Sequence, residues 1–140
     1  MNDPSPKSIV TTAEIIDRLT QATVDLLWSS ESDYPFEIVT WSQGTQLTPE
    51  ALVGDSDDAN PEIESMTLID LFAPILAIED WYEAAELAQV DRYTHLLQAI
   101  DTNLANVQVF RVGEVEITIY IVGKTAAGDV VGLKTHVVET

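Results

Sequence analysis

The sequence predicts an α+β fold with a mostly antiparallel sheet. Two observations lead to this class: apolar residues at helical spacing precede a C-terminal run of β-branched residues, and the connections between the last strands are too short for crossover helices. With 140 residues and 46% hydrophobic content, the chain has the size and apolar material of one folded unit. Residues 1–140 are therefore expected to form a single domain, with residues 1–10 flexible.

The first helix is predicted over residues 12–28. Thr11 and Glu14 have the spacing of a capping box, and apolar residues then recur at helical spacing. A polar turn is expected at residues 29–33. The aromatic and β-branched residues 36–41 then predict a strand.

A long acidic surface loop is predicted over residues 42–65, where no periodicity persists and Gly and Pro recur. Residues 67–77 are an apolar helical stretch that Pro74 interrupts or starts. The clearest helix follows: Asp80 and Glu83 have capping-box spacing, and an apolar stripe runs from Leu87 to Leu104. This helix should end near residue 103 or 106 and cover one face of the sheet.

Strands are predicted at residues 107–112, 115–122 and 130–138, and their short connections predict an antiparallel meander. In the middle strand Ile117, Ile119 and Ile121 alternate with more polar residues. Because both faces of these strands are strongly apolar, we expect helices on both sides of the sheet.

The charge is strongly unbalanced, with 24 acidic residues against six Lys and Arg and a net charge of −18. Fifteen of the acids lie between residues 25 and 86, an interval without Lys or Arg. Nucleic acids and anionic membranes both require clustered basic residues, so neither is an expected partner. A basic protein is an expected partner, because a negative field attracts it and raises its association rate. The alternative is acidity that only maintains solubility or reflects a salty habitat.

No enzyme or cofactor motif is present. The chain has no cysteine, its two histidines have no metal-ligand spacing, and neither a nucleophile elbow nor a P-loop occurs. A hydrolase with paired carboxylates is the weaker alternative. The N-terminus lacks the features of a secretory signal and no apolar run approaches the ~18 residues that span a bilayer, so a cytoplasmic protein is expected.

Three residues have placements that suit contact with a partner. Glu31 lies in the polar turn between helix and strand, where the alternative is a solvated turn. Trp81 falls in the first helical turn after the predicted capping box, either as a core staple or as an interface anchor. Thr140 carries the C-terminal carboxylate directly after a strand, although most chain ends fray.

These placements coincide with a family resemblance that covers nearly the whole chain. The segments that carry it are SSESDYPFE at residues 29–37, EDWYE at 79–83, NLANVQVFRVGEVEITIYIVGKTAAGD at 103–129 and GLKTHVVET at 132–140. Together they resemble the nuclease A inhibitor family of bacterial proteins. Residues 1–10 and 42–65 do not resemble it.

The resemblance implies a three-layer α/β/α sandwich, similar to plant pathogenesis-related class 1 proteins, and inhibition of a sugar-nonspecific DNA and RNA nuclease of the ββα-metal type. The family's contact residues fall on Glu31, Trp81 and Thr140. The Thr140 carboxylate is implied to reach the partner's divalent metal, Mg²⁺ or Mn²⁺, because such ions prefer oxygen donors. Glu79 stands where a member of the family has glutamine, so its charge either strengthens the contact with a basic rim, together with Asp80, or is only exposed.

Two hypotheses follow for function. The first is an inhibitor without a cofactor of its own, a monomer when free, that binds the active site of the nuclease. The second is an acidic adaptor on the same fold that binds another basic protein and inhibits no nuclease.

Overall fold

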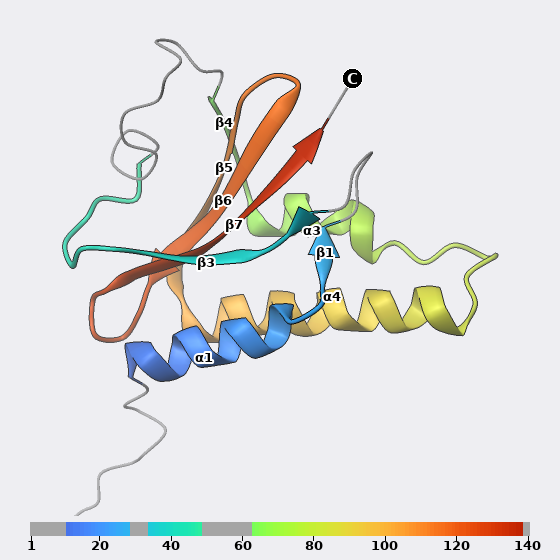
Figure 1. Ribbon diagram of the computed structural model, residues 1–140, viewed down its shortest axis with the longest axis horizontal. Helices are drawn as coiled ribbons and strands as arrows, with labels where there is room; N and C mark the ends of the chain where they lie inside the picture. The colour runs from blue at the N-terminus through green and yellow to red at the C-terminus, as the bar shows by residue number, and fades with distance from the viewer. Residues whose placement is uncertain (1–10, 29–33, 49–62, 139–140) are drawn as a thin grey trace, which may run out of the picture.

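A five-stranded antiparallel sheet with helices against it forms the body of the protein (Figure 1). The computed structural model describes residues 11–28, 34–48 and 63–138. The order of the strands across the sheet is β3-β7-β6-β5-β4. The helices are α1 (Thr12–Thr23), α3 (Leu68–Leu76) and α4 (Ala84–Asn103), and the sheet strands are β3 (Glu37–Trp41), β4 (Ile63–Met66), β5 (Ala105–Val112), β6 (Glu116–Lys124) and β7 (Val130–Val138). The predicted α+β class is confirmed.

Helix α1 begins where the sequence predicts and ends earlier. The Glu14 N–H donates to Thr11 Oγ1 at 3.1 Å, which caps the first turn. The predicted end at residue 28 is wrong, because the helix stops at Thr23 and Asp25 adopts a left-handed φ of 56°. The freed carbonyl of Val24 accepts a hydrogen bond from the Arg92 guanidinium at 2.7 Å, so a residue of α4 stabilises the early end.

A small hairpin arm, made of β1 (Leu27–Trp28) and β2 (Tyr34–Pro35), begins where the last turn of the helix was predicted. Strand β1 pairs with β2, and Trp28 lies opposite Tyr34. The hairpin is also tied to the main sheet, because the Thr135 hydroxyl of β7 donates to the Pro35 carbonyl at 2.9 Å. Strand β1 therefore replaces the end of the predicted helix, and its pairing with β2 brings Trp28 and Tyr34 side by side.

The predicted meander is confirmed. Strands β5, β6 and β7 follow one another as antiparallel neighbours. At the first turn Gly113 has a φ of +119°, and a Cβ there would lie 2.3 Å from the Glu116 carbonyl oxygen, so the position requires glycine. At the second turn the Asp129 carboxylate accepts a hydrogen bond from Thr12 Oγ1 at 2.5 Å, which joins the turn to the start of α1.

Strand β4 corrects part of the predicted surface loop. Residues 63–65 pair with β5 as an edge strand, and Glu64 lies opposite Arg111 and forms an ion pair with it at 3.2 Å. The sequence did not reveal this strand because its pairing depends on a partner almost 50 residues away and its residues are mostly exposed. The rest of the predicted loop at residues 49–62 lies outside the described residues. Next to β4, Thr67 caps α3 and Pro74 lies inside that helix, close to the predicted limits of 67–77.

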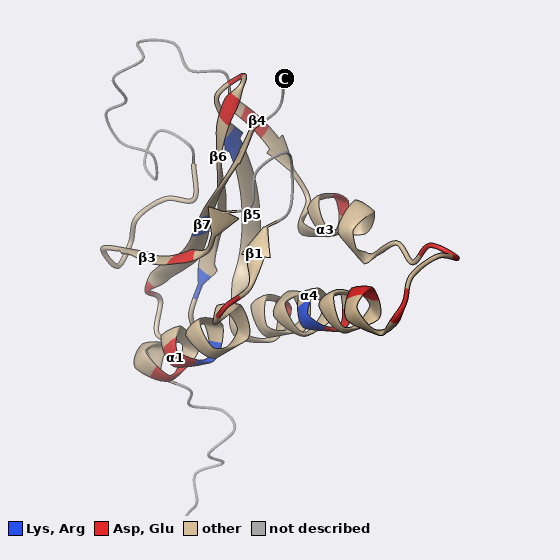
Figure 2. Ribbon diagram, turned by 45° about the vertical axis from the view of Figure 1, so that its right-hand side comes forward, with Lys and Arg blue, Asp and Glu red and all other residues tan. Residues whose placement is uncertain are grey.

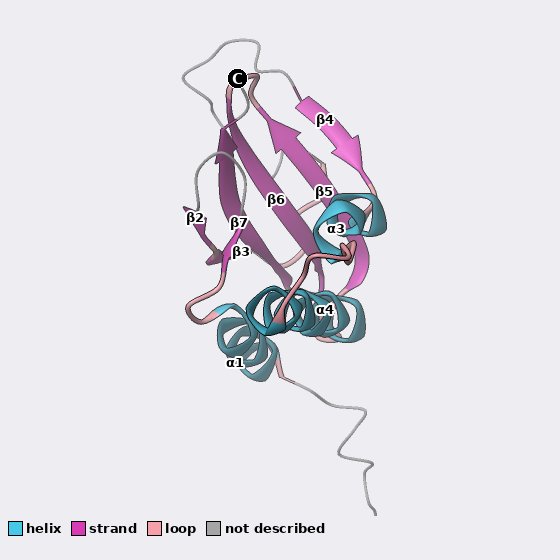
Figure 3. Ribbon diagram, turned by 90° about the vertical axis from the view of Figure 1, so that its right-hand side faces the viewer, coloured by secondary structure: helices cyan, strands magenta, loops and turns pink. Residues whose placement is uncertain are grey.

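Helices α1, α3 and α4 pack on one face of the sheet (Figure 3). Ile117, Ile119 and Ile121 point into the core that they share with these helices, as the alternation predicted. On the opposite face Phe110 and Val122 belong to a second, smaller apolar cluster. No helix within residues 11–28, 34–48 and 63–138 covers that second face, so the three-layer sandwich and its likeness to pathogenesis-related class 1 proteins stay predictions.

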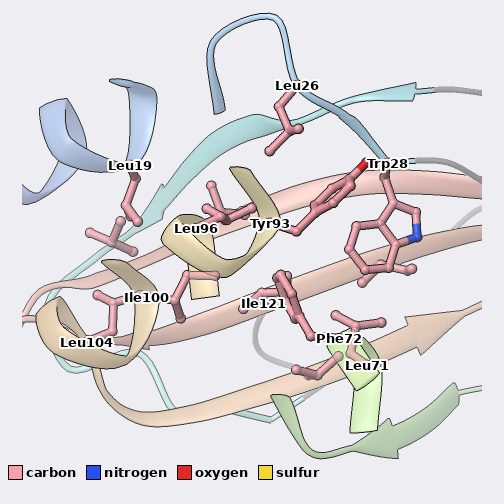
Figure 4. Close-up of a cluster of buried hydrophobic side chains, with 14 of the residues drawn as sticks. Leu19, Leu26, Trp28, Leu71, Phe72, Tyr93, Leu96, Ile100, Leu104 and Ile121 are labelled. Carbon is pink, nitrogen blue, oxygen red and sulfur yellow. The ribbon is translucent and has the colours of Figure 1, made fainter. Parts of the chain in front are cut away.

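A cluster of aromatic rings occupies the core between the helices and the sheet (Figure 4). The Trp28 indole makes edge-to-face contacts with Phe36, Phe72 and Tyr93, with ring centroids 5.5–6.0 Å apart. The Tyr93 hydroxyl donates to the backbone carbonyl of Leu27. Trp28 thereby joins the hairpin arm to both α3 and α4.

The substitution Trp28→Ala should lower the free energy of unfolding by about 3–5 kcal/mol, because it leaves a cavity against three rings. Urea denaturation measures this. Trp81→Ala is the matched control, since that indole is 68% exposed, and it should change stability by no more than about 0.5 kcal/mol. Equal losses in the two variants would contradict the central position of Trp28.

Candidate functional site

The loop between α3 and α4 carries three of the predicted contact residues, Glu79, Asp80 and Trp81. The capping box predicted from Asp80 and Glu83 is wrong. Helix α4 begins at Ala84, and the Glu83 N–H donates to Glu86 Oε1 at 2.8 Å, so the reciprocal pair is three residues further along. Both pairs have the same sequence spacing, and only the backbone path distinguishes them. Trp81 consequently lies before the helix and not in its first turn.

The Trp81 indole lies at the surface. It is 68% exposed, in a turn that the Tyr82 N–H closes by donating to the Glu79 carbonyl at 3.0 Å. The edge of Tyr82 contacts it, with ring centroids 4.6 Å apart and planes at 75°. The sequence left two positions open for Trp81, a staple into the core or an anchor at the surface. In the structure its ring lies at the surface.

Two carboxylates accompany the indole on the same projecting loop. Glu79 and Asp80 are exposed, and the loop shows acidic segments and no basic one (Figure 2). Within the part of the chain that the structure describes, neither carboxylate forms an ion pair. The loop therefore combines a large apolar surface with unneutralised negative charge.

The arginines of the described chain are engaged by their own protein. Arg92 donates to the Val24 carbonyl, Arg18 donates to Asn103 Oδ1 at 2.9 Å, and Arg111 pairs with Glu64. These interactions hold helices and edge strand together.

A groove next to this loop was not predicted. It has a volume of about 430 Å³ and lies between α3, the hairpin arm and the sheet. No sequence signal marks it, because its walls come from seven separate elements: β1, β4, α3, the α3–α4 loop, β5, β6 and β7. Its lining consists of Trp28, Met66, Asp70, Leu71, Pro74, Ile75, Tyr82, Arg111, Ile119 and Val137.

The groove lies close in the chain to each of the three predicted contact residues, Glu31, Trp81 and Thr140. Trp28 precedes Glu31 by three residues, Tyr82 adjoins Trp81, and Val137 precedes Thr140 by three residues. Glu31 and Thr140 themselves lie outside the described residues. Described residues within three positions of each contact residue thus line one hollow.

The described residues give little support for a catalytic or metal-binding cluster. His95 is exposed beside Asp91, and His136 is half-buried against Thr118 and Tyr34, as expected for surface or partly packed histidines. Among the described residues no group of three or more His, Asp or Glu is placed to hold a metal ion. The groove and its two neighbouring hollows each contain a single carboxylate, so they offer no acid pair for hydrolysis.

Within the described chain, no helix is both long enough and apolar enough to cross a membrane.

Fold and surface together define the class: an acidic α+β protein with an antiparallel sheet that presents an exposed tryptophan among carboxylates. The family model described as "Nuclease A inhibitor-like protein" matches residues 13–140, and the chain belongs to this family. The family resemblance of the sequence is thereby confirmed. A comparison with curated proteins finds no match.

Glu86→Ala should lower the free energy of unfolding by about 0.5–2 kcal/mol, because the Glu83 N–H loses its acceptor at the start of α4. Thermal and urea denaturation measure the loss. Glu86→Gln keeps an acceptor oxygen and should retain most of the stability. If both variants lost the same amount, the charge of Glu86 at the helix N-terminus would be the cause and not its hydrogen bond.

Proposed function

We propose that this protein inhibits a sugar-nonspecific nuclease of the ββα-metal type by binding across its active site. The observation that carries the proposal is an exposed Trp81 between unpaired acids in a chain of the nuclease A inhibitor-like family. Tryptophans at the centre of an interface dominate binding energies, and a nuclease that binds phosphates offers a basic surface to the acids.

The C-terminal carboxylate of Thr140 is proposed to ligate the divalent metal of the nuclease, directly or through water. A terminal carboxylate is ionised at pH 7 and is a hard oxygen donor of the kind Mg²⁺ and Mn²⁺ prefer. Strand β7 supports this role, because it lies between β3 and β6 and its pairing continues to Val138, opposite Glu116. Only two residues separate that pair from the chain end.

Glu31 is proposed to bind a basic residue of the nuclease that otherwise contacts substrate. The segment at residues 29–33 connects β1 with β2, so the Trp28–Tyr34 pair determines where it starts and ends. The hydrogen bond from Thr135 to Pro35 ties this hairpin arm to β7. Because the same strand leads to Thr140, both proposed anionic contacts depend on one structural support.

Trp81 would then exclude water beside these anionic contacts, which strengthens charge-assisted hydrogen bonds. Glu79 and Asp80 extend the acidic surface along the loop. The net charge of −18 would accelerate encounter with a basic nuclease, and this contribution would weaken with salt.

Deletion of Thr140, or amidation of the C-terminus, should weaken inhibition of a ββα-metal nuclease at least tenfold, about 1.4 kcal/mol. The measurement is the inhibition constant for cleavage of double-stranded DNA at a fixed Mg²⁺ concentration. Thr140→Ser keeps the terminal carboxylate and should inhibit like the unaltered chain. Unchanged inhibition by the amidated protein would remove the metal-ligand role.

Trp81→Ala should weaken binding to the same nuclease by at least 2 kcal/mol, about 30-fold, while the protein stays folded. Isothermal titration calorimetry measures the affinity. Ile69→Ala is the control, because Ile69 is also exposed, at 64%, and lines a hollow that contains none of the proposed contact residues. The adaptor hypothesis would replace inhibition if the unaltered chain bound a basic protein but inhibited no nuclease of this type.

A further inference from the structure

The lining of the groove includes a buried hydrogen-bond donor, the Trp28 indole N–H, that has no partner among the described residues. Trp28 is only 6% exposed, and its ring forms edge-to-face pairs with Phe36, Phe72 and Tyr93. Within the described chain its indole N–H has no acceptor. In Figure 4 the indole nitrogen points away from the other labelled side chains of the core. Buried tryptophan N–H groups normally have a partner, so this position points to an external acceptor.

The walls around this donor are mainly apolar and accessible from outside. Leu71, Pro74 and Ile75 come from α3, while Ile119 and Val137 come from the sheet. The volume of about 430 Å³ is within the range of sites that enclose an apolar group and orient it with few polar contacts. The groove is therefore suited to an apolar side chain with an oxygen acceptor next to it.

The acids around the groove indicate which molecule supplies that side chain. Asp70 is exposed on the groove wall, and Glu86 lines a neighbouring hollow that shares Ile75 and Tyr82 with the groove. Tyr82 also contacts the Trp81 ring. The groove thus continues the surface on which the nuclease is proposed to bind, and the exposed Asp70 carboxylate complements a basic partner.

We propose that the groove receives an apolar side chain of the nuclease, and that a backbone carbonyl of the same nuclease segment accepts a hydrogen bond from the Trp28 indole N–H. Asp70 pairs with a Lys or Arg beside that segment. This inference rests on the proposed function, and it adds a second anchor beside Trp81 that contacts neither the metal nor the substrate-binding residues of the nuclease.

The indole N–H signals test the hydrogen bond directly. The chain has three tryptophans, so ¹⁵N labelling gives three indole signals, which single Trp→Phe variants assign. The titrant is a purified ββα-metal nuclease that the unaltered chain inhibits. On binding, the Trp28 proton signal should shift and its exchange with solvent should slow, while the Trp41 signal should not change, because Trp41 packs on the opposite face of the sheet. A shifted Trp81 signal with an unchanged Trp28 signal would overturn the inference.

Two substitutions test the binding contribution. Trp28→Phe keeps a ring and removes the donor, and should weaken binding about three- to tenfold, the range for one net hydrogen bond. Ile75→Glu puts a charge in the groove and should weaken binding at least tenfold. Ile69→Glu is its matched control, since Ile69 is on the same helix, is 64% exposed, and lines a different hollow. Melting temperatures establish that each variant is folded, and the indole signals of the unaltered chain remain decisive if one is not.

The outcomes separate this inference from the proposed function. If the unaltered chain inhibits no ββα-metal nuclease, the proposed function is wrong. If it inhibits, and Ile75→Glu binds as tightly as Ile69→Glu, the proposed function stands and the groove is not part of the interface. If Ile75→Glu abolishes self-association in sedimentation and leaves nuclease binding unchanged, the groove binds a second copy of the chain and the inference is overturned.

Discussion

The packing of the Trp28 ring is the interaction on which the rest of the structure depends. This one side chain contacts Phe72 of α3 and Tyr93 of α4, and it belongs to the hairpin arm. The arm is in turn bonded to β7 through Thr135. The same side chain lines the groove. The relative positions of hairpin, helices and C-terminal strand therefore follow from how one indole is enclosed.

The protein separates a neutral core from a charged exterior. The rings and branched aliphatic residues that stabilise the fold are almost completely buried, whereas the acids of the α3–α4 loop stay in water. Three arginines are used for internal bonds and do not neutralise that loop. Self-repulsion among carboxylates opposes compaction. A basic partner that neutralised them would relieve this repulsion. Partner binding would therefore explain the acidic surface on physical grounds other than solubility.

Under the proposed mechanism, carboxylates take the places that substrate phosphates hold in the nuclease. Such mimicry requires anionic groups held at definite positions, because flexible ones would lose conformational entropy on binding. The hairpin and the sheet hold the described residues that flank the proposed anionic groups, Trp28 and Tyr34 beside Glu31 and Val138 before Thr140. Trp81 reaches the surface by a different route, through the turn before α4 and the edge of Tyr82.

The sequence by itself determined the α+β class, the meander, the alternation in β6, the acidic character and the family, because each is encoded in local periodicity, composition or contiguous motifs. The sequence also identified Trp81 as a candidate contact residue, but it did not predict the turn that exposes the ring. Only the tertiary structure decided where α1 ends, that β4 exists, which capping pair starts α4, and that a groove opens beside Trp81. Those features arise from contacts between distant segments, such as Arg92 with Val24 and Arg111 with Glu64, which no local pattern specifies.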